Sequence, residues 1–229
     1  MRKVQLLLAA GDGATDGLTD LLLDQFSFVR EQPGGIYRLA LRDAASRAVS
    51  PDMGVPEFDA VLELGVPDTA GDEPLLAAAA RLGPQFAPLI DGARSAIVLG
   101  QEIEIVPGEG EFELFRCMSR KPGLTLEQFS DHWLTIHSQF GRAVPGHPGY
   151  RQLHRDPDAQ TAAGKAAGIA IDTVDGVATL HMAGTASVGL LGSDPEQAKA
   201  TAADGALFVD RSKAMGMIAR VVVVAGPLP

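Results

Sequence analysis

Apolar runs of strand length alternate along the chain with segments in which apolar residues recur every three or four positions. In the first half, strands are predicted at residues 3–10, 36–42, 58–65 and 95–106, and helices at 18–30 and 72–86. In the second half, strands are predicted at residues 112–118, 150–154, 177–182 and 218–225, and helices at 125–140 and 194–213. Both halves are therefore expected to follow the order strand, helix, strand, strand, helix, strand.

This order is that of the split βαβ, or ferredoxin-like, unit, whose four-stranded sheet carries helices on one face only. The other face has to be buried or carry a site. The break at Pro107–Gly110 is short, which favours two units packed together over two independent domains. We predict an α+β protein in which residues 1–107 and 108–229 form two ferredoxin-like βαββαβ units, packed sheet to sheet as an intrachain αβ-barrel with a central cavity. An Ala/Gly-rich loop is expected at about residues 156–172.

Composition and charge limit the classes of function that are expected for this chain. The net charge is −10 and there is no basic stripe, so we expect no nucleic-acid partner. No apolar run reaches the roughly 18 residues of a membrane helix, and the first one stops at Gly11, too early for a signal peptide, so a cytoplasmic protein without a membrane partner is expected. Gly11–Gly13 lacks the spacing of a phosphate loop and is predicted to be a turn. The single cysteine, Cys117, excludes an intrachain disulfide and fits a buried thiol better than a nucleophile.

Five segments of the second half occur in an order typical of one family. They comprise a Lys-Pro-Gly turn before a helix, a His-Trp…His pattern on that helix, a Pro-Gly…Tyr-x-Gln-x-His strand, an Asp-Gly-x-Ala strand start and a Phe-x-Asp helix end. In this chain they are Arg120–Phe129, His132–His137, Pro145–His154, Asp175–Ala178 and Gly205–Asp210. Over about residues 111–225 the chain therefore resembles the EthD family, whereas the first half matches only in the order of its elements.

The resemblance implies a dimeric αβ-barrel fold, often built from two chains, for which the tandem halves would here supply both sheets. It also implies a small-molecule ligand, because related barrels include cofactor-free dehydratases, cyclases, decarboxylases and monooxygenases acting on aromatic or polyketide-like compounds. Haem-binding relatives exist as well. The third strand departs from the pattern, since Thr179 and His181 stand where the family often carries an acid and a tryptophan.

All five histidines lie in the second half, which predicts a single site in one half of the barrel. His137 shares the apolar face of its helix with Phe129 and Trp133, so it points to the sheet or the cavity rim, either as a proton-transfer group or as a core histidine. His132 lies five residues earlier, roughly 140° around an α-helix, so the two are not expected to chelate one metal. His132 is expected in solvent or at the rim.

Strand alternation places Tyr150, Gln152 and His154 on one face, and Thr179 and His181 on one face of the next strand. If both faces line the cavity, His154 and His181 converge with Tyr150 and Gln152. Imidazole titrates near pH 6.5 and suits proton transfer, and Tyr150 can donate to a carbonyl or phenolate oxygen. The alternative is that these polar side chains simply meet water.

Arg116 interrupts an otherwise apolar strand face, as an anchor for a carboxylate or phenolate or as the partner of an acid at the core edge. The residues predicted to be catalytic are His137, His154, His181 and Tyr150. The residues predicted to bind substrate are Arg116, Gln152, Trp133 and Thr179, and neither a metal nor a cofactor is expected.

The favoured hypothesis is a cofactor-independent lyase, a dehydratase or decarboxylase, that acts on a small aromatic or polyketide-like compound by histidine acid/base catalysis. Aromatic compound catabolism is the expected setting, and the family habit suggests a homodimer. Two alternatives stay open. One is an oxygenase of the same barrel class, cofactor-free or haem-dependent, and the other is a binding protein without chemistry.

Overall fold

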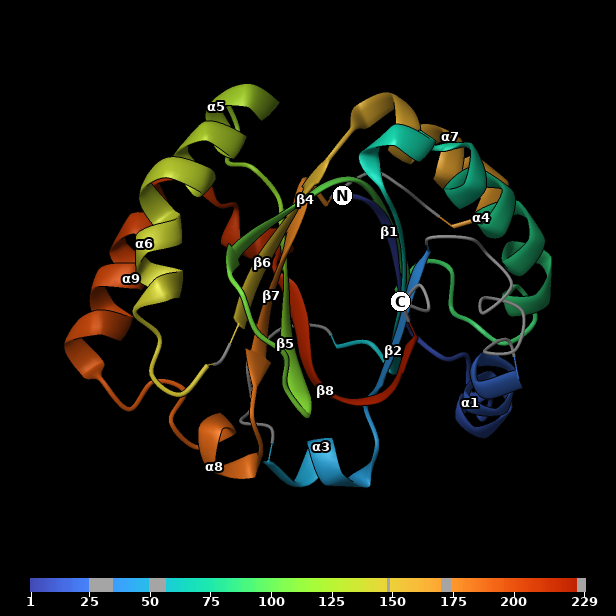
Figure 1. The fold of residues 1–229 in the computed structure, drawn as a ribbon, viewed down its shortest axis with the longest axis horizontal. Coiled ribbons are helices and arrows are strands. Elements are labelled where there is room, and N and C mark those ends of the chain that lie inside the picture. The colour runs from blue at the N-terminus through green and yellow to red at the C-terminus, as the bar shows by residue number, and fades with distance from the viewer. Residues whose placement is uncertain (25–34, 50–56, 148, 170–173, 226–229) are drawn as a thin grey trace.

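The computed structural model describes residues 1–24, 35–49, 57–147, 149–169 and 174–225. Within these residues eight antiparallel strands close into a barrel in the order β1-β3-β2-β8-β5-β7-β6-β4 (Figure 1). The strands are β1 (Arg2–Leu8), β2 (Ile36–Leu41), β3 (Ala60–Val66), β4 (Ala96–Val106), β5 (Phe112–Met118), β6 (Gly149–Arg155), β7 (Gly176–Met182) and β8 (Met215–Ala225). The first-half strands run β4-β1-β3-β2 and the second-half strands run β8-β5-β7-β6, so the predicted pair of ferredoxin-like units is confirmed.

Two antiparallel seams join the halves. At one seam β2 pairs with β8, with a shift in register between Leu39 and Ala40. At the other, β4 pairs with β6 from Gly100 opposite Arg155 to Val106 opposite Tyr150. Every edge strand of the two units thus finds a partner in the same chain, which leaves no open sheet edge in the barrel. The division into domains at residues 107 and 108 stays a prediction.

Helices cover the outer face of each half (Figure 1). Those on the second half are α5 (Leu126–His132), the π-helix η2 (Trp133–His137), α6 (Ser138–Arg142) and α9 (Pro195–Phe208). Those on the first half are α1 (Thr15–Asp24), α4 (Glu73–Phe86) and α7 (Pro157–Ala167). The shorter elements are η1 (Asp68–Ala70), α3 (Ala44–Val49), α8 (Thr185–Val188) and η3 (Arg211–Lys213). None of the helices described is long and apolar enough to span a bilayer.

The Ala/Gly-rich segment after β6 is a helix, α7, and the expectation of a loop there is wrong for its described part. Asp156 caps the helix by accepting a hydrogen bond from the Ala159 amide, and Gly168 ends it in the left-handed conformation. Alanine favours helix without large apolar side chains to mark a period. These small residues allow close packing, since a Cβ at Gly83 of α4 would overlap Ala167. The helix predicted at residues 18–30 corresponds to α1, which ends at Asp24. Residues 25–30 lie outside the described part of the chain.

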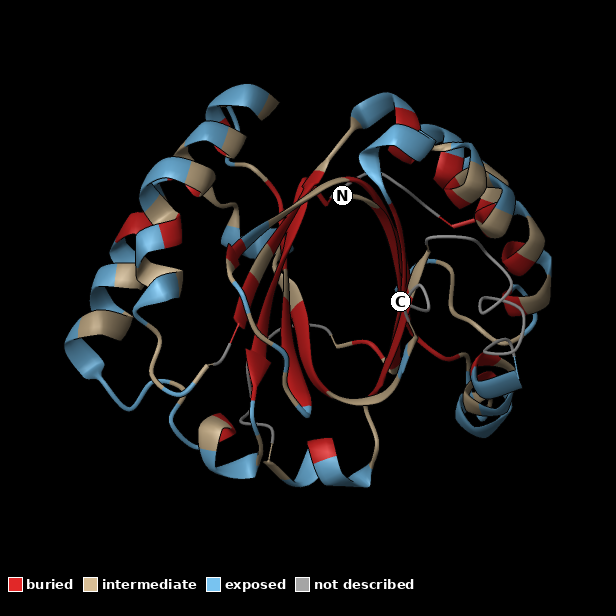
Figure 2. Cartoon of the chain, in the orientation of Figure 1, coloured by how far each residue is buried: buried red, intermediate tan, exposed pale blue. Residues whose placement is uncertain are grey.

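Alternation along the strands produces three apolar layers. Figure 2 shows that the strands are mostly buried and that the helices outside them are partly exposed. Leu6, Leu39 and Leu99 are among the residues beneath the first-half helices. The barrel interior includes Leu7, Val61, Val98, Phe115, Cys117 and Met217. The layer beneath the second-half helices includes Phe112, Phe129, Trp133, Tyr150 and Phe208. Burial raises the pKa of Cys117 to about 12, which keeps this thiol protonated and agrees with a structural role.

The seam between β4 and β6 depends on a glycine. A Cβ at Gly100 would overlap the carbonyl oxygen of His154. We expect Gly100→Ala to lower the free energy of unfolding by about 1–3 kcal/mol, as overpacking does, measured by urea denaturation. Gly92→Ala is the matched control, because a Cβ there meets no heavy atom within 4 Å. Equal stability of the two variants would show that the backbones at the seam are not in close contact.

Candidate active site

A cavity of about 540 Å³ lies between the outer face of the second-half sheet and its helices. Its lining is mainly apolar, with Leu114, Met118, Val144, Leu180 and Leu191 among the residues. The polar and aromatic side chains that line it are Arg116, Trp133, His137, Tyr150, Gln197 and Thr201. The central cavity expected inside the barrel is thus not the space that these residues line, because they lie on the opposite face of the sheet.

The helix over this cavity changes its winding along its length. A capping box, in which Thr125 and Gln128 exchange side-chain and backbone hydrogen bonds, starts α5. From Trp133 to His137 the backbone then winds as a π-helix. A π turn holds more residues than an α turn, so side chains five positions apart come to the same side. His132 and His137 therefore face the same partner, and the prediction that they point in different directions, which assumed α-helical winding, is wrong.

That partner is Asp204 of α9. His137 Nδ1 lies 2.7 Å from Asp204 Oδ2, and His132 Nε2 lies 3.1 Å from Oδ1. The Asp204 carboxylate is buried, with its side chain 10% exposed. Burial lowers the pKa of His137, and the Asp204 carboxylate opposes this only in part. A neutral His137 that donates Nδ1–H to Asp204 keeps Nε2 unprotonated, so it can act as a base on the cavity side.

Asp204 was not among the residues predicted from the sequence. Its signal was the helical spacing of Gln197, Thr201, Asp204 and Phe208, which places an acid on the side of α9 that packs inward. Phe208 packs against both histidines, with ring centroids 4.7 Å from His132 and 4.9 Å from His137. An acid on such a face needs a partner, and the two histidines supply it.

Tyr150 receives a chain of hydrogen bonds from the sheet and the helix. Trp133 Nε1 donates to its hydroxyl at 3.2 Å and Gln152 Nε2 donates at 2.8 Å. His154 Nε2 lies 2.9 Å from Gln152 Oε1, where it can act as the donor. Burial raises the pKa of Tyr150 although both hydrogen bonds oppose the shift. The protonated hydroxyl accepts twice and keeps its own hydrogen for a ligand.

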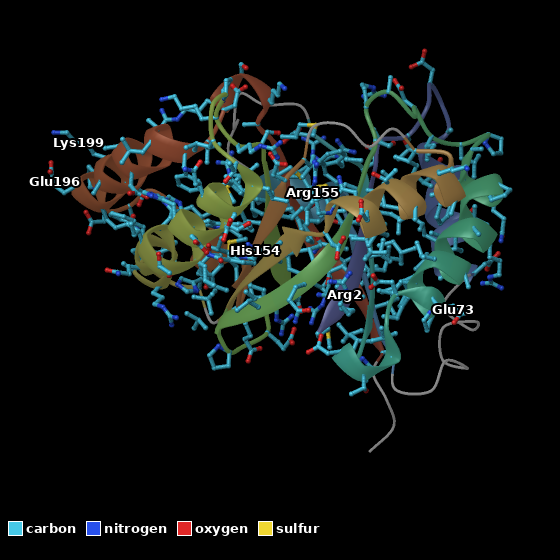
Figure 3. The ribbon with its side chains drawn as sticks, turned by 90° about the horizontal axis from the view of Figure 1, so that it is seen from above. Arg2, Glu73, His154, Arg155, Glu196 and Lys199 are labelled. Atoms are coloured by element: carbon cyan, nitrogen blue, oxygen red, sulfur yellow. The ribbon has the colours of Figure 1, made fainter. Side chains whose placement is uncertain are left out.

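Gln152 and His154 extend the hydrogen-bond network around Tyr150. The rings of His154 and Trp133 lie 4.4 Å apart, and Gln152 Nε2 also donates to the Trp133 carbonyl. His154 is labelled on β6 in Figure 3. Burial lowers the pKa of His154 to about 4, so this imidazole is neutral at pH 7. Neither Gln152 nor His154 is among the described residues that line the cavity.

Arg116 lines the cavity from the middle of β5. Within the described part of the chain it has neither a hydrogen bond nor an ion pair from its side chain, so the predicted pairing with an acid at the core edge is not formed there. Burial lowers the pKa of Arg116, although a guanidinium stays charged at neutral pH. A half-buried cation without a counter-ion, facing an apolar cavity, favours an anionic or oxygen-rich ligand.

His181 and Thr179 do not join this site, so the predicted convergence with His154 is wrong. Residues directly opposite each other on paired strands share a face, and Tyr150 pairs with Leu180 while Gln152 pairs with Ala178. His181 and Thr179 therefore face the barrel interior. A shift of one residue in the pairing reverses such an assignment, and alternation within each strand does not reveal the pairing.

Inside the barrel His181 belongs to a buried ionic cluster. Its Nδ1 lies 3.0 Å from Glu113 Oε1, although neither ring nitrogen has a partner in hydrogen-bonding geometry among the described residues. Arg38 lies 2.9 Å from Glu113 and 3.6 Å from Glu63, and Lys3 lies 3.1 Å from Glu63. These side chains are almost fully buried, so each charge is compensated by its ion-pair partner. Removal of one member would leave an uncompensated charge in the core.

Comparisons with known proteins agree with this fold. The sequence profile of the EthD domain matches residues 121–212. An anthrone oxidase-like protein superimposes with a TM-score of 0.63 at 10% identity, covering 100% of this chain and 93% of that chain. A chlorite dismutase-like protein gives 0.55 at 13% identity, covering 97% and 96%, and a monooxygenase-like protein of Fusobacterium nucleatum gives 0.57 at 8%, covering 99% and 95%. At these identities the likeness shows the fold alone. None of the curated proteins matches the sequence.

The depressed pKa of His154 predicts an acid-sensitive fold. Between pH about 6.5 and 4 the unfolded chain binds a proton at this residue and the folded chain does not. The contribution of neutral His154 to the free energy of unfolding is complete above about pH 6.5. It is lost as the pH falls towards 4, with a slope of up to about 1.4 kcal/mol per pH unit. We expect His154→Gln to flatten this part of the stability curve, measured by urea unfolding at a series of pH values. His147→Gln should keep the wild-type slope, and an unchanged slope in His154→Gln would contradict the assignment.

Proposed function

We propose that the cavity beneath the helices of the second half, whose residues 121–212 match the EthD domain, is the active site of a cofactor-independent lyase for a small aromatic or polyketide-like compound. The observation that supports this most is that the His137–Asp204 pair and Arg116, which has no ion pair among the described residues, meet in one mainly apolar cavity. A base and a cation that line the same mainly apolar cavity suit a reaction in which a proton leaves and negative charge develops on an oxygen.

His137 is the proposed base. Its Nε2 takes a proton from a carbon next to a carbonyl group, or from an acidic hydroxyl, of the bound compound. Asp204 holds Nδ1–H and stabilises the imidazolium that forms, and its second contact with His132 keeps the carboxylate in place. The lowered pKa of His137 keeps the ring unprotonated before the reaction at neutral pH.

Arg116 and Tyr150 are proposed to stabilise the oxygen on which charge develops. Both line the cavity, and Tyr150 is held in position by Trp133 and Gln152. Donors that are already oriented in a site with little water stabilise an oxyanion more than solvent does. In a dehydration, the enolate formed by proton removal expels hydroxide from the neighbouring carbon, and the imidazolium of His137 returns the proton to form water.

An oxygenase is the second candidate, because the similar folds include anthrone oxidase-like and monooxygenase-like proteins. The same proton removal yields a carbanion that can react with O₂. The residues of the cavity also fit haem. Histidines that bind a metal often donate their other ring N–H to a carboxylate, as His137 does through Nδ1 to Asp204. Bound haem would supply O₂ chemistry, and His137 would hold its iron.

Homodimer formation and a cytoplasmic location stay predictions. The barrel closes within one chain, so a dimer is not needed to complete the sheet. Light scattering on the purified protein decides the oligomeric state.

Variants at the cavity test the proposed base. Against a panel of hydroxyaromatic ketones, β-hydroxyketones and aromatic β-ketoacids, we expect His137→Gln to lower kcat by about 10²–10⁴-fold, as loss of a general base does. Asp204→Asn should lower kcat less and shift the pH profile, and Arg116→Gln should lower kcat, because it removes a cation that stabilises the developing oxyanion. His147→Gln is the control, because this histidine contacts only backbone carbonyl groups in the described chain and lies outside the cavity. Full activity of His137→Gln would rule out the assignment, and ligand binding without turnover by the wild type would indicate a binding protein.

Oxygen dependence separates the two candidate enzymes. We expect turnover of the accepted compound to continue under nitrogen, with product mass lower by one water or one carbon dioxide. Turnover that stops without O₂ would contradict the lyase. Titration with haemin, followed by absorbance, tests the haem-dependent form, for which a Soret band in the wild type would be lost in His137→Gln.

A further inference from the structure

A second, polar cleft of about 340 Å³ lies beyond the end of β5 and shares no lining residue with the cavity. We call it the basic cleft, and its charged residues are Arg120, Lys121, Arg155, Asp175, Asp210 and Lys213. They come from the turn after β5, the end of β6, the start of β7 and the segment after α9. Three of the EthD-like segments meet here, although the proposed chemistry uses none of these residues.

Asp175 organises two guanidinium groups in this cleft. Its Oδ2 accepts the backbone N–H of Arg120 at 2.7 Å, and its Oδ1 accepts Arg120 Nη1 at 2.6 Å. Arg155 Nη1 lies 3.1 Å from the same Oδ1. One carboxylate thus orients two cations and balances only one of them. Arg155 Nε has no hydrogen-bond partner among the described residues. Asp175 therefore does not satisfy all the N–H donors of Arg120 and Arg155.

The two lysines add further positive charge. Lys121 is fixed at the end of α9, where its backbone N–H donates to the Phe208 carbonyl at 2.7 Å and Nζ donates to the Ala206 carbonyl at 2.9 Å. These acceptors are neutral, so the lysine charge is not cancelled. Lys213 is exposed and has no ion pair in the part of the chain that the structure describes.

The charge balance of the cleft is opposite to that of the protein. Four cations face two carboxylates, Asp175 and Asp210, which leaves an excess of two positive charges in a chain whose net charge is −10. Asp210 is itself engaged, because its Oδ1 accepts hydrogen bonds from the Ser212 backbone N–H and hydroxyl. The turn also leaves room, since nothing lies within 4 Å of the position of a Cβ at Gly123.

We propose that the basic cleft binds a phosphate group, either as the free anion or as the monoester of a small molecule. A phosphate dianion matches the excess charge of the cleft, and its oxygens suit the fixed guanidinium groups of Arg120 and Arg155. The cleft has the volume of a small-molecule site. This site is independent of the reaction proposed for the cavity.

Calorimetric titration with inorganic phosphate, phenyl phosphate and acetate, at constant ionic strength, tests the proposal on the full chain. We expect both phosphates to bind and acetate to bind at least tenfold more weakly. Tighter binding of phenyl phosphate would identify an ester site, and equal binding a site for the free anion. Absence of heat or of thermal stabilisation with 10 mM of either phosphate would overturn the proposal.

Charge-matched variants locate the binding. Lys213→Gln should weaken phosphate binding about five- to tenfold, and Arg155→Gln more. Lys199→Gln is the control, because Lys199 is exposed on α9 and lies far from Arg155 in Figure 3. If Arg155→Gln fails to fold because Asp175 loses a partner, Lys213→Gln still decides the matter, since its side chain has no such role. Equal weakening in Lys213→Gln and Lys199→Gln would refute a specific site.

Discussion

Two antiparallel seams, β2 with β8 and β4 with β6, close the sheets of both halves into one barrel. A closed sheet has an inner face that its own side chains fill, and here apolar residues and a buried ionic cluster around Arg38 and Glu63 fill it. The cavity proposed as the active site therefore lies on the outer face of the second half, between sheet and helices. The same closure lets α7, which follows β6, pack on α4 of the first half.

Above that outer face, a change in helical winding assembles the proposed base. In an α-helix the side chains of His132 and His137 would point in different directions. In the π-helical segment both side chains reach Asp204. π-helical turns often occur at functional sites for this reason, because they reposition single side chains without ending the helix.

The EthD-like segments divide between two places. Trp133, His137 and Tyr150 line the cavity, while the Lys-Pro-Gly turn and Asp175 line the basic cleft. Asp175 and Arg120 tie the turn to the start of β7, so these residues stabilise the fold as well as setting the charge of the cleft. The family pattern thus contains residues that make structural contacts and residues that line a cavity within a few positions of each other.

The eight strands and the helices of the two ferredoxin-like units could be read from the sequence, because strand and helix periods are local properties. Helix α7 was expected to be a loop, because its small residues carry no clear apolar period. The face of His137 was predicted in the same way as the strands and helices. Tyr150, Trp133 and Arg116 were each predicted as site residues, and their roles remain proposed. Asp204, the π-helical turn and the inner position of His181 were not predicted. They depend on strand register and on contacts between α9 and η2, which lie about 70 residues apart, and single-strand patterns carry no information on either. Local residue patterns therefore specify which side chains a strand or helix presents on each face, whereas long-range packing brings particular side chains into contact.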